Sequence, residues 1–319
     1  MLRLYQHQIA THIIHTPRCN VWSSMGSGKT LATLFAVDML DLLEPVFPML
    51  IIAPKRVIDT VWEQEANKWA ITKHLRFERL TGAAPKRTEA LSRPADIYLI
   101  NFELLEWLDY SLGTEFPFRM IVVDESSRLK GHRSRGGSKR CAALARRCKD
   151  AKIRFVNLTG TPAPNSLMDL WGQMWFIDGG KRLGRSFSAF RDRWFDARKV
   201  GRHQFAVEYV PKPHADREIR ELIKDVTITV DIADYMDISK PVVTTVPVTL
   251  PPKAASVYED MEKTMFVELA KGTAEPVSAA AKTSKCHQIA NGAIYLDDQD
   301  GAWELVHDAK LDALESVIE

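Results

Sequence analysis

The sequence has no apolar run long enough to cross a bilayer, and its N-terminus lacks an apolar leader. A membrane span needs roughly 20 consecutive apolar residues. We therefore expect a cytoplasmic protein without a membrane partner. Cysteine is also scarce: Cys19, Cys141, Cys148 and Cys286 form no C-x-x-C pair. We expect free thiols, with neither zinc nor disulfides.

Net charge is almost absent as well, at +2 over 319 residues, but the basic residues are unevenly spread. Residues 128–154 hold eleven Lys or Arg against the single acid Asp150. Such a segment repels itself unless it meets an anion, and basic loops suit contacts with nucleic-acid phosphates. The alternative is a solvated charged face. A hydrophobic content of 45% excludes a disordered chain.

What the sequence does contain is a glycine-rich loop after an apolar run. Residues 23–30 read Ser-Ser-Met-Gly-Ser-Gly-Lys-Thr, which departs from the pattern G-x-x-x-x-G-K-[ST] only at Ser23. Such a loop turns backbone N–H groups toward one point and binds phosphates. We expect ATP to bind at the residues Met25, Gly26, Ser27, Gly28, Lys29 and Thr30. The alternative is an ordinary Gly-Ser turn that opens a helix.

A second motif, Met-Ile-Val-Val-Asp-Glu at residues 120–125, is an apolar run that ends in two acids. This pattern is typical of a buried parallel strand with carboxylates at its C-terminal end. Lys29 would contact the β- and γ-phosphates, and Thr30 and Asp124 would hold Mg²⁺. Glu125 would orient or deprotonate the attacking water, so the predicted catalytic residues are Lys29, Asp124 and Glu125. The alternative for the two acids is a solvated strand end.

With both motifs placed, the sequence resembles the superfamily 2 helicases, most closely their Swi/Snf-type branch of double-stranded-DNA translocases. The resemblance implies an α/β fold, a P-loop RecA-like parallel sheet flanked by helices, with a mostly helical second subdomain. In the initial segment it implies that Gln6 reads the adenine edge and Arg3 packs on the ring, with Gln8 as an alternative to Gln6.

The resemblance also assigns contacts along the chain. It implies that Pro54, Lys55, Arg56, Lys130, Arg133 and Arg135 contact the DNA backbone, and that Thr159, Gly160 and Thr161 couple hydrolysis to DNA movement near Asp124 and Glu125. We interpret Trp62, Glu65 and Trp69, at helical spacing, as packing residues rather than contacts. One departure matters: Ser126 and Ser127 stand where the family has Ala-His or Gly-His. Without that His, the resemblance does not imply how this position couples ATP to DNA, but the hydrolytic carboxylate of Glu125 is present.

Three segments follow as predicted domains: 1–165 is the RecA-like ATP-binding domain, 166–302 a helical protrusion with short strands, and 303–319 the lead-in to a second RecA-like domain. That second domain, with its arginine fingers, is expected C-terminal to this chain. Residues 225–230 and 241–250 are predicted as strands. Residues 141–149, 187–195 and 254–269 are predicted as helices. For the aromatic and basic stretch 181–202 we favour core packing over stacking on single-stranded bases.

The predicted function is ATP hydrolysis that drives movement along duplex DNA, with ATP and Mg²⁺ as cofactors and poor activity of this fragment alone. The alternative is a nucleotide-gated nucleic-acid-binding module with little hydrolysis. A small-molecule kinase is disfavoured by the Leu-Thr-Gly-Thr-Pro segment at 158–162. A bacterial or phage origin fits the compact chain.

Overall fold

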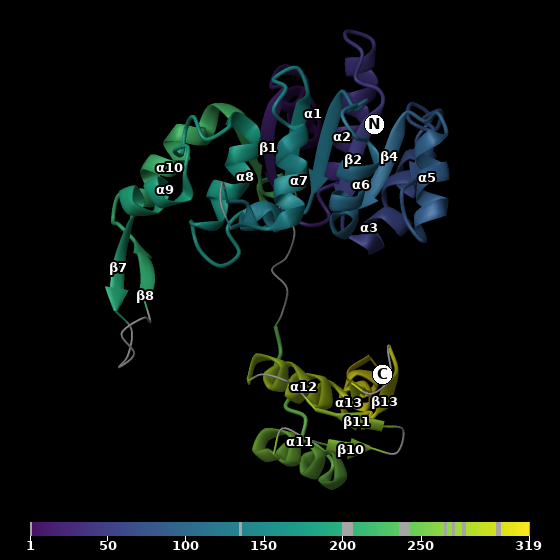
Figure 1. Ribbon diagram of the computed structural model, residues 1–319, viewed down its shortest axis with the longest axis vertical. Coiled ribbons are helices and arrows are strands. Elements are labelled where there is room, and N and C mark those ends of the chain that lie inside the picture. The colour runs from purple at the N-terminus through teal and green to yellow at the C-terminus, as the bar shows by residue number, and fades with distance from the viewer. Residues whose placement is uncertain are drawn as a thin grey trace. The chain divides into compact units, whose positions relative to one another are not determined.

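The computed structural model describes residues 2–133, 136–199, 207–235, 243–264, 267–269, 272–275, 279–297 and 301–318. The chain forms two compact units, Met1–Ile238 and Ser239–Glu319 (Figure 1).

The first unit is built on a seven-stranded sheet in which every neighbouring pair is parallel. The strand order is β3-β4-β2-β5-β6-β1-β9. The bounds are β1 (Arg18–Ser23), β2 (Met49–Ala53), β3 (Phe77–Arg79), β4 (Ile97–Asn101), β5 (Met120–Asp124), β6 (Arg154–Thr159) and β9 (Thr227–Val230). Strands β2, β4 and β5 are buried along their whole length. Continuous apolar runs are typical of parallel strands in a sheet that is covered on both faces. The predicted parallel sheet is confirmed.

Helices cover both faces of this sheet. One face packs against α1 (Leu4–His15), α2 (Lys29–Asp41), α3 (Lys55–Thr60) and α4 (Trp62–Asn67). The other packs against α5 (Ala84–Ser92), α6 (Leu105–Ser111), α7 (Lys139–Arg147) and α8 (Asp169–Asp178), together with the 3₁₀ turns η1 (Phe102–Leu104) and η2 (Ser126–Gly131). Side chains alternate along each strand, so β2 sends Met49 and Ile51 into one core and Leu50 and Ile52 into the other.

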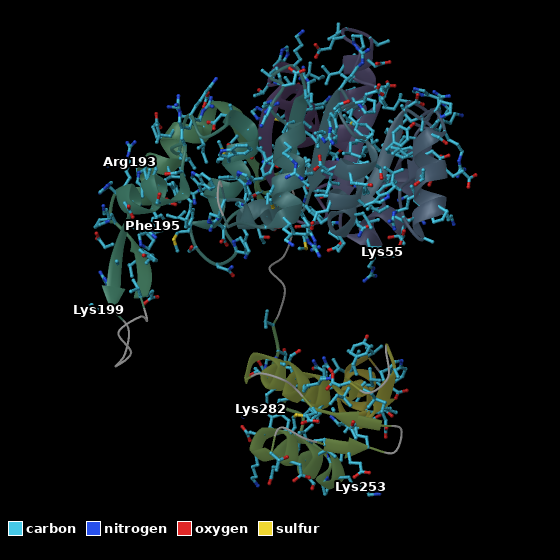
Figure 2. All side chains as sticks on the ribbon, in the orientation of Figure 1. Lys55, Arg193, Phe195, Lys199, Lys253 and Lys282 are labelled. Carbon is cyan, nitrogen blue, oxygen red and sulfur yellow. The ribbon has the colours of Figure 1, made fainter. Side chains whose placement is uncertain are left out.

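Between β6 and β9 the chain leaves the sheet and returns to it. This excursion contains α8, α9 (Phe187–Trp194), the antiparallel hairpin β7 (Phe195–Lys199) and β8 (Val207–Pro211), α10 (Ala215–Ile223) and η3 (Lys224–Val226); η4 (Ile232–Asp234) follows β9. The hairpin projects from the unit, with Lys199 near its tip (Figure 2). Phe190, Trp194 and Phe195 are buried, which confirms core packing for residues 181–199 of the aromatic stretch; residues 200–202 lie outside the described residues.

Because β9 completes the same sheet as β6, residues 166–226 are an insertion between two strands of one unit. The structure divides the chain once, between residues 238 and 239, whereas the sequence placed divisions at 165 and 302. The predicted functional domains 1–165, 166–302 and 303–319 stay a prediction. Within them, the predicted helix at 141–149 is α7, and the predicted strand at 225–230 is η3 followed by β9.

The second unit is small and mixed. It contains α11 (Pro252–Thr264), the hairpin β10 (Val267–Leu269) and β11 (Gly272–Ala274), α12 (Ala279–Asn291), the hairpin β12 (Ala293–Tyr295) and β13 (Trp303–Leu305), and α13 (Ala309–Ile318). The predicted helix 254–269 ends at Thr264, because the chain turns into β10. The predicted strand 241–250 is wrong for its described residues: 243–250 pair with no described strand, and Val243 is 86% exposed. Across the described part of the chain, every helix is too short or too polar to span a bilayer.

Candidate functional site

Three loops meet at one edge of the sheet because of the strand order. Strand β6 lies between β1 and β5, with Trp22 paired to Thr159 and Asp124 paired to Leu158. All three strands are parallel, so their C-terminal ends point to the same edge. The glycine-rich loop, the acidic pair and the Thr-Gly-Thr turn therefore lie side by side, although more than a hundred residues separate the first from the last.

The glycine-rich loop needs its glycines for two different reasons. Gly26 and Gly28 have φ of 76° and 74°, the left-handed region that favours glycine. At Gly28 space is also limiting, because a Cβ there would lie 2.3 Å from Nε2 of Gln6. Gly28 is the N-cap of α2, so the unpaired N–H groups of the first helical turn face the loop. This geometry favours an anion at that point.

Lys29 follows directly and is held by the loop itself. Its Nζ donates to the carbonyl oxygens of Ser23 at 2.8 Å and Ser24 at 3.1 Å. Burial lowers the pKa of Lys29, and the charges of Asp124 and Glu125 act in the opposite direction. The ammonium group thus lies between the phosphate loop and the two acids.

The carboxylate of Asp124 is fixed at both oxygens. Trp62 Nε1 donates to Oδ2 at 3.2 Å, and the backbone N–H of Glu125 donates to Oδ1 at 3.1 Å. Burial first, and then the neighbouring Glu125 charge, raise the pKa of Asp124 to about 6; Lys29 and Trp62 partly offset this. A divalent cation at this carboxylate would favour its ionised form.

Glu125 has an unusual backbone. Its φ is 58° and its ψ is 51°, and among the described residues it alone has positive φ without being glycine. A left-handed conformation costs a residue with a side chain on the order of 1 kcal/mol and is concentrated at functional sites. Here it ends β5 abruptly and turns the chain into η2.

These groups surround one cavity of about 460 Å³, within the usual range for small-ligand sites. It is lined by Met25, Gly26, Gly28, Lys29, Thr30, Val57, Val61, Glu65, Asp124 and Glu125. The Thr30 hydroxyl and the Asp124 carboxylate are the hard oxygen donors that Mg²⁺ prefers, so the residues present fit that ion. Ser27, a residue of the loop that was predicted to bind ATP, is fully buried and does not line this cavity. The sequence did not predict that Val57, Val61 and Glu65 line this cavity. Their positions depend on how α3 and α4 pack on the sheet.

The predicted adenine-reading residues lie beside the loop rather than in the cavity lining. Gln6 is buried; its Oε1 accepts from Arg3 N at 2.9 Å, and its Nε2 donates to Ser27 O at 3.1 Å. Gln8 accepts from the hydroxyl of Tyr235 at 2.8 Å. The adenine contacts of Arg3 and Gln6 stay a prediction.

The Thr-Gly-Thr turn is linked to the acidic motif by a residue that sequence reasoning missed. Thr159 Oγ1 accepts from Thr161 N at 3.0 Å, a bond within the turn. The link to the acidic motif runs through Gln173 on α8, whose Oε1 accepts from Ser126 Oγ at 3.0 Å and whose Nε2 donates to Pro162 O at 2.5 Å. Gln173 is 2% exposed, and the signal that could have revealed it is its polarity amid the apolar residues of α8. The coupling role of Thr159, Gly160 and Thr161 stays a prediction.

The predicted DNA-contacting residues differ in the ion pairs and hydrogen bonds that they form within the protein. Lys55 and Arg56 are exposed after Pro54 at the start of α3, and Lys55 Nζ lies 2.6 Å from Asp59 (Figure 2). Lys130 Nζ lies 3.6 Å from Asp169.

Arg133 is more constrained. It donates to the carbonyl oxygens of Lys130 and His132, and its guanidinium lies 3.5 Å from the ring centre of Phe187. Arg133 thus fastens the basic loop to α9, and Arg135 lies outside the described residues. Contact of all these residues with DNA stays a prediction.

Comparisons with known proteins give related sequences and a similar fold. Residues 19–291 match the family described as the SNF2-related domain. Protein p41 of Acyrthosiphon pisum secondary endosymbiont phage 1 is 45% identical over 318 residues, which are 99% of this chain and 69% of that protein. The ISWI chromatin-remodeling complex ATPase ISW1 of Saccharomyces cerevisiae is 28% identical over 159 residues, 48% of this chain and 13% of its own length.

Among solved structures, the Sulfolobus solfataricus SWI2/SNF2 ATPase core in complex with dsDNA aligns with a TM-score of 0.58 at 22% identity. The alignment covers 100% of this chain and 64% of that chain. At this identity the likeness concerns the fold, and the predicted RecA-like α/β fold is confirmed.

Proposed function

Since this chain belongs to the family of SNF2-related domains, we propose that it is the ATP-binding part of a DNA-dependent ATPase that moves along duplex DNA. The observation that carries the proposal is the convergence of Lys29, Thr30, Asp124 and Glu125 on one cavity behind a glycine-rich helix N-terminus. A phosphate-binding loop facing two carboxylates is the arrangement that nucleoside triphosphate hydrolysis needs.

In the proposed mechanism, the phosphates of ATP occupy the loop and Lys29 exchanges its bonds to the Ser23 and Ser24 carbonyls for phosphate oxygens. Thr30 and Asp124 would hold Mg²⁺, which would neutralise charge on the phosphates. Glu125 accepts a proton from a water whose oxygen bonds to the γ-phosphorus as the bond to the β,γ-bridging oxygen breaks. Trp62 keeps the Asp124 carboxylate oriented throughout.

The proposed DNA partner is supported by two basic regions. Lys55 and Arg56 follow β2 at the same sheet edge as the cavity. Lys130 lies on η2, the turn that begins directly after Glu125. The relative solved with duplex DNA shares this fold. Contacts of this kind read the phosphate backbone and not the base sequence.

A second RecA-like domain is proposed to complete the catalytic site. Among the described residues that line the cavity there is no arginine, whereas an arginine finger contributes roughly 10³ to 10⁵ in turnover. The chain spans 69% of the phage relative and 64% of the solved structure, which leaves part of each relative unmatched. The missing arginine also favours the second candidate function, a module that binds nucleotide and DNA with little turnover on its own.

Displacement of a third strand from a DNA triplex tests movement along the duplex directly. We expect the product of the whole gene to release the third strand in the presence of ATP and to leave the underlying duplex paired. Glu125→Gln should bind the triplex and release nothing. Separation of the duplex strands, or no release by the wild type, would contradict the proposed translocation. The predicted cytoplasmic location of the protein stays a prediction.

A further inference from the structure

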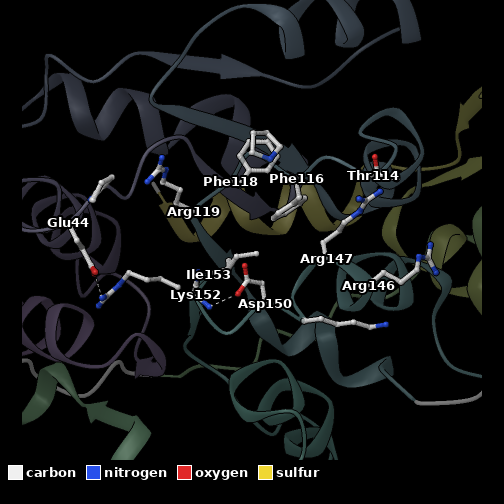
Figure 3. A pocket seen from close by; sticks show the side chains of 14 residues that line it. Glu44, Thr114, Phe116, Phe118, Arg119, Arg146, Arg147, Asp150, Lys152 and Ile153 are labelled. Carbon is white, nitrogen blue, oxygen red and sulfur yellow. Dashed lines mark hydrogen bonds and ion pairs between the residues drawn. The ribbon is translucent and has the colours of Figure 1, made fainter.

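Another cavity, of about 570 Å³, is larger than the cavity lined by Lys29 and Asp124, here called the nucleotide cavity, and lies at the opposite edge of the sheet. Figure 3 shows the side chains that line it. It is bounded by the loops that precede β5 and β6 and by the C-terminal end of α7. Strands β5 and β6 begin there at Met120 and Arg154, and β5 ends at Asp124, which lines the nucleotide cavity. With five residues in β5 at about 3.3 Å each, the two cavities are roughly 16 Å apart.

The lining of this cavity, here called the cationic pocket, has an excess of positive charge. Its basic residues are Arg119, Arg146, Arg147, Lys149, Lys152 and Arg154, against the acids Glu44 and Asp150. Arg146 and Arg147 pair with Asp109, and Arg154 pairs with Glu44. Within the described part of the chain, the side chains of Arg119, Lys149 and Lys152 form no ion pair and no hydrogen bond; it is the backbone N–H of Lys152 that donates to Asp150 Oδ1, at 2.9 Å. Three cationic side chains thus line the pocket without an ion pair of their own.

The loop that bears Lys149 and Lys152 is held by hydrogen bonds to its backbone. Arg18 donates to the carbonyl oxygens of Cys148 at 2.9 Å, Asp150 at 2.6 Å and Ile153 at 3.1 Å. One guanidinium therefore fixes the backbone of the loop that bears Lys149 and Lys152. Arg147 donates to the carbonyl oxygen of Gly113 at 2.7 Å, directly before the lining residue Thr114. A ligand would meet backbone walls that are already ordered, which lowers the entropic cost of binding.

The pocket also has an apolar side. The rings of Phe116 and Phe118 meet edge to face, with centroids 5.2 Å apart, and Ile153 and two prolines complete this side. In Figure 3 the two phenylalanines lie between Arg119 and Arg147. A hollow with an apolar wall and convergent cations fits a ligand that has both phosphates and a ring. A nucleic-acid backbone would instead require cations spread along a stripe.

We propose that the cationic pocket binds a phosphorylated small molecule of nucleotide size, at a site separate from the nucleotide cavity. Arg119, Lys149 and Lys152 contact the phosphates, and the phenylalanine side accommodates the ring. This binding does not depend on ATP hydrolysis or on DNA.

The test uses Lys29→Ala protein, in which the phosphate loop has lost its cation, and titrates it calorimetrically with inorganic pyrophosphate and with ADP. We expect saturable binding at one site for each probe. Adding Lys149→Gln and Lys152→Gln should weaken it at least tenfold. The matched control adds Lys73→Gln and Lys86→Gln, two exposed lysines on the same unit and away from the pocket; its affinity should stay within twofold.

Three results would overturn the proposal. The first is that Lys29→Ala protein shows no saturable binding, and the second is that the Lys73 and Lys86 control weakens binding equally. The third is that pyrophosphate and ADP do not bind, whereas a short DNA duplex binds tightly and loses this binding when Lys149 and Lys152 are substituted. The last result would assign the pocket to nucleic-acid phosphates. The substituted lysines are exposed, so thermal unfolding of all variants should match and exclude misfolding as a cause.

Discussion

The two edges of the same sheet carry charge in opposite ways. At the C-terminal edge, Asp124 is 8% exposed, Glu125 is held in a left-handed conformation, and the pKa values of Lys29 and Asp124 are shifted. At the N-terminal edge, Lys149 and Lys152 are exposed side chains on a fixed backbone. Burial changes the proton affinity of a charged group and suits it to chemistry, whereas exposed cations supply attraction alone. The comparison predicts a large loss of ATP hydrolysis on substitution at the first edge, and at the second edge a loss of ligand affinity without a change in stability.

The largest effect is expected for Glu125→Gln. Without a carboxylate to accept the proton of the attacking water, ATP hydrolysis should fall by roughly 10² to 10⁴-fold. ATP binding should persist, because a glutamine side chain of nearly the same size would still line the cavity. Lys29→Ala should lose binding at the nucleotide cavity, so that only binding at the cationic pocket remains. Phosphate release and equilibrium ATP binding, measured side by side, distinguish these outcomes, and equal hydrolysis by wild type and Glu125→Gln would remove Glu125 from the mechanism.

The next effect concerns a buried histidine beside the basic loop. His132 is 3% exposed and lies parallel to Trp171, with centroids 5.7 Å apart. Burial, and secondarily the charge of Arg133, lower the pKa of His132 to about 4. Protonation of His132 therefore favours the unfolded chain. The stability of the fold with a neutral His132 is fully present above about pH 6.5 and is lost as the pH falls toward 4.

This loss should reach at most about 3 kcal/mol in the free energy of unfolding. Urea unfolding at pH 7 and pH 5 measures the part of it that falls between those two values. His132→Phe should reduce the difference between the two pH values, while His15→Phe, at an exposed position, should leave it intact. An unchanged pH dependence in His132→Phe would show that this histidine is not the group responsible.

Trp62→Phe sharpens the comparison at the nucleotide edge. The substitution removes the donor to Asp124 Oδ2 and leaves a buried carboxylate oxygen without that hydrogen bond. We expect a loss of about 1–3 kcal/mol in urea unfolding at neutral pH. The matched control is Trp69→Phe, because Trp69 Nε1 donates to the partly exposed Glu65 at 3.1 Å and should contribute less than about 1 kcal/mol. Equal losses would contradict the special position of Trp62.

Gln173→Leu tests the connection between the acidic motif and the Thr-Gly-Thr turn. It removes the bonds to Ser126 Oγ and Pro162 O and should cost about 1–2 kcal/mol of stability. In the product of the whole gene, we expect DNA stimulation of ATP hydrolysis to fall more than the rate without DNA. Gln173→Glu, which keeps the acceptor for Ser126, should retain part of the stimulation. A parallel fall of both rates would reduce Gln173 to a packing role.

The smallest effect on stability is expected for Lys55→Ala. The exposed pair with Asp59 should contribute less than about 0.5 kcal/mol. DNA binding should nonetheless change: the slope of log affinity against log salt should decrease by about 0.9, the value for one phosphate contact. Lys73→Ala should leave that slope unchanged. The same decrease in both variants would show that Lys55 has no specific contact.

The parts of the site that the sequence predicted are those whose signal is local. The glycine-rich loop and the acidic pair are each contiguous, and the continuous apolar strands before them indicate a parallel sheet with both motifs at one edge. Contacts between distant segments could not be predicted in this way. The bond from Trp62 to Asp124 and the bridge through Gln173 depend on how α4 and α8 pack on the sheet.

Propensity alone also misled the sequence reasoning in one place. Residues 243–250 are rich in β-branched residues, but a strand is stabilised by pairing, and the described part of the chain offers this segment no partner. By contrast, residues 227–230 of the predicted strand 225–230 form β9 and pair with β1.

The most direct test of the central claim is ATP hydrolysis by the product of the whole gene, with and without duplex and single-stranded DNA, across a salt series and with Glu125→Gln as control. We predict stimulation by duplex DNA that weakens as salt rises, because backbone contacts release counterions. ATP binding without acceleration by any nucleic acid would contradict the account and leave a nucleotide-gated binding module as the better description.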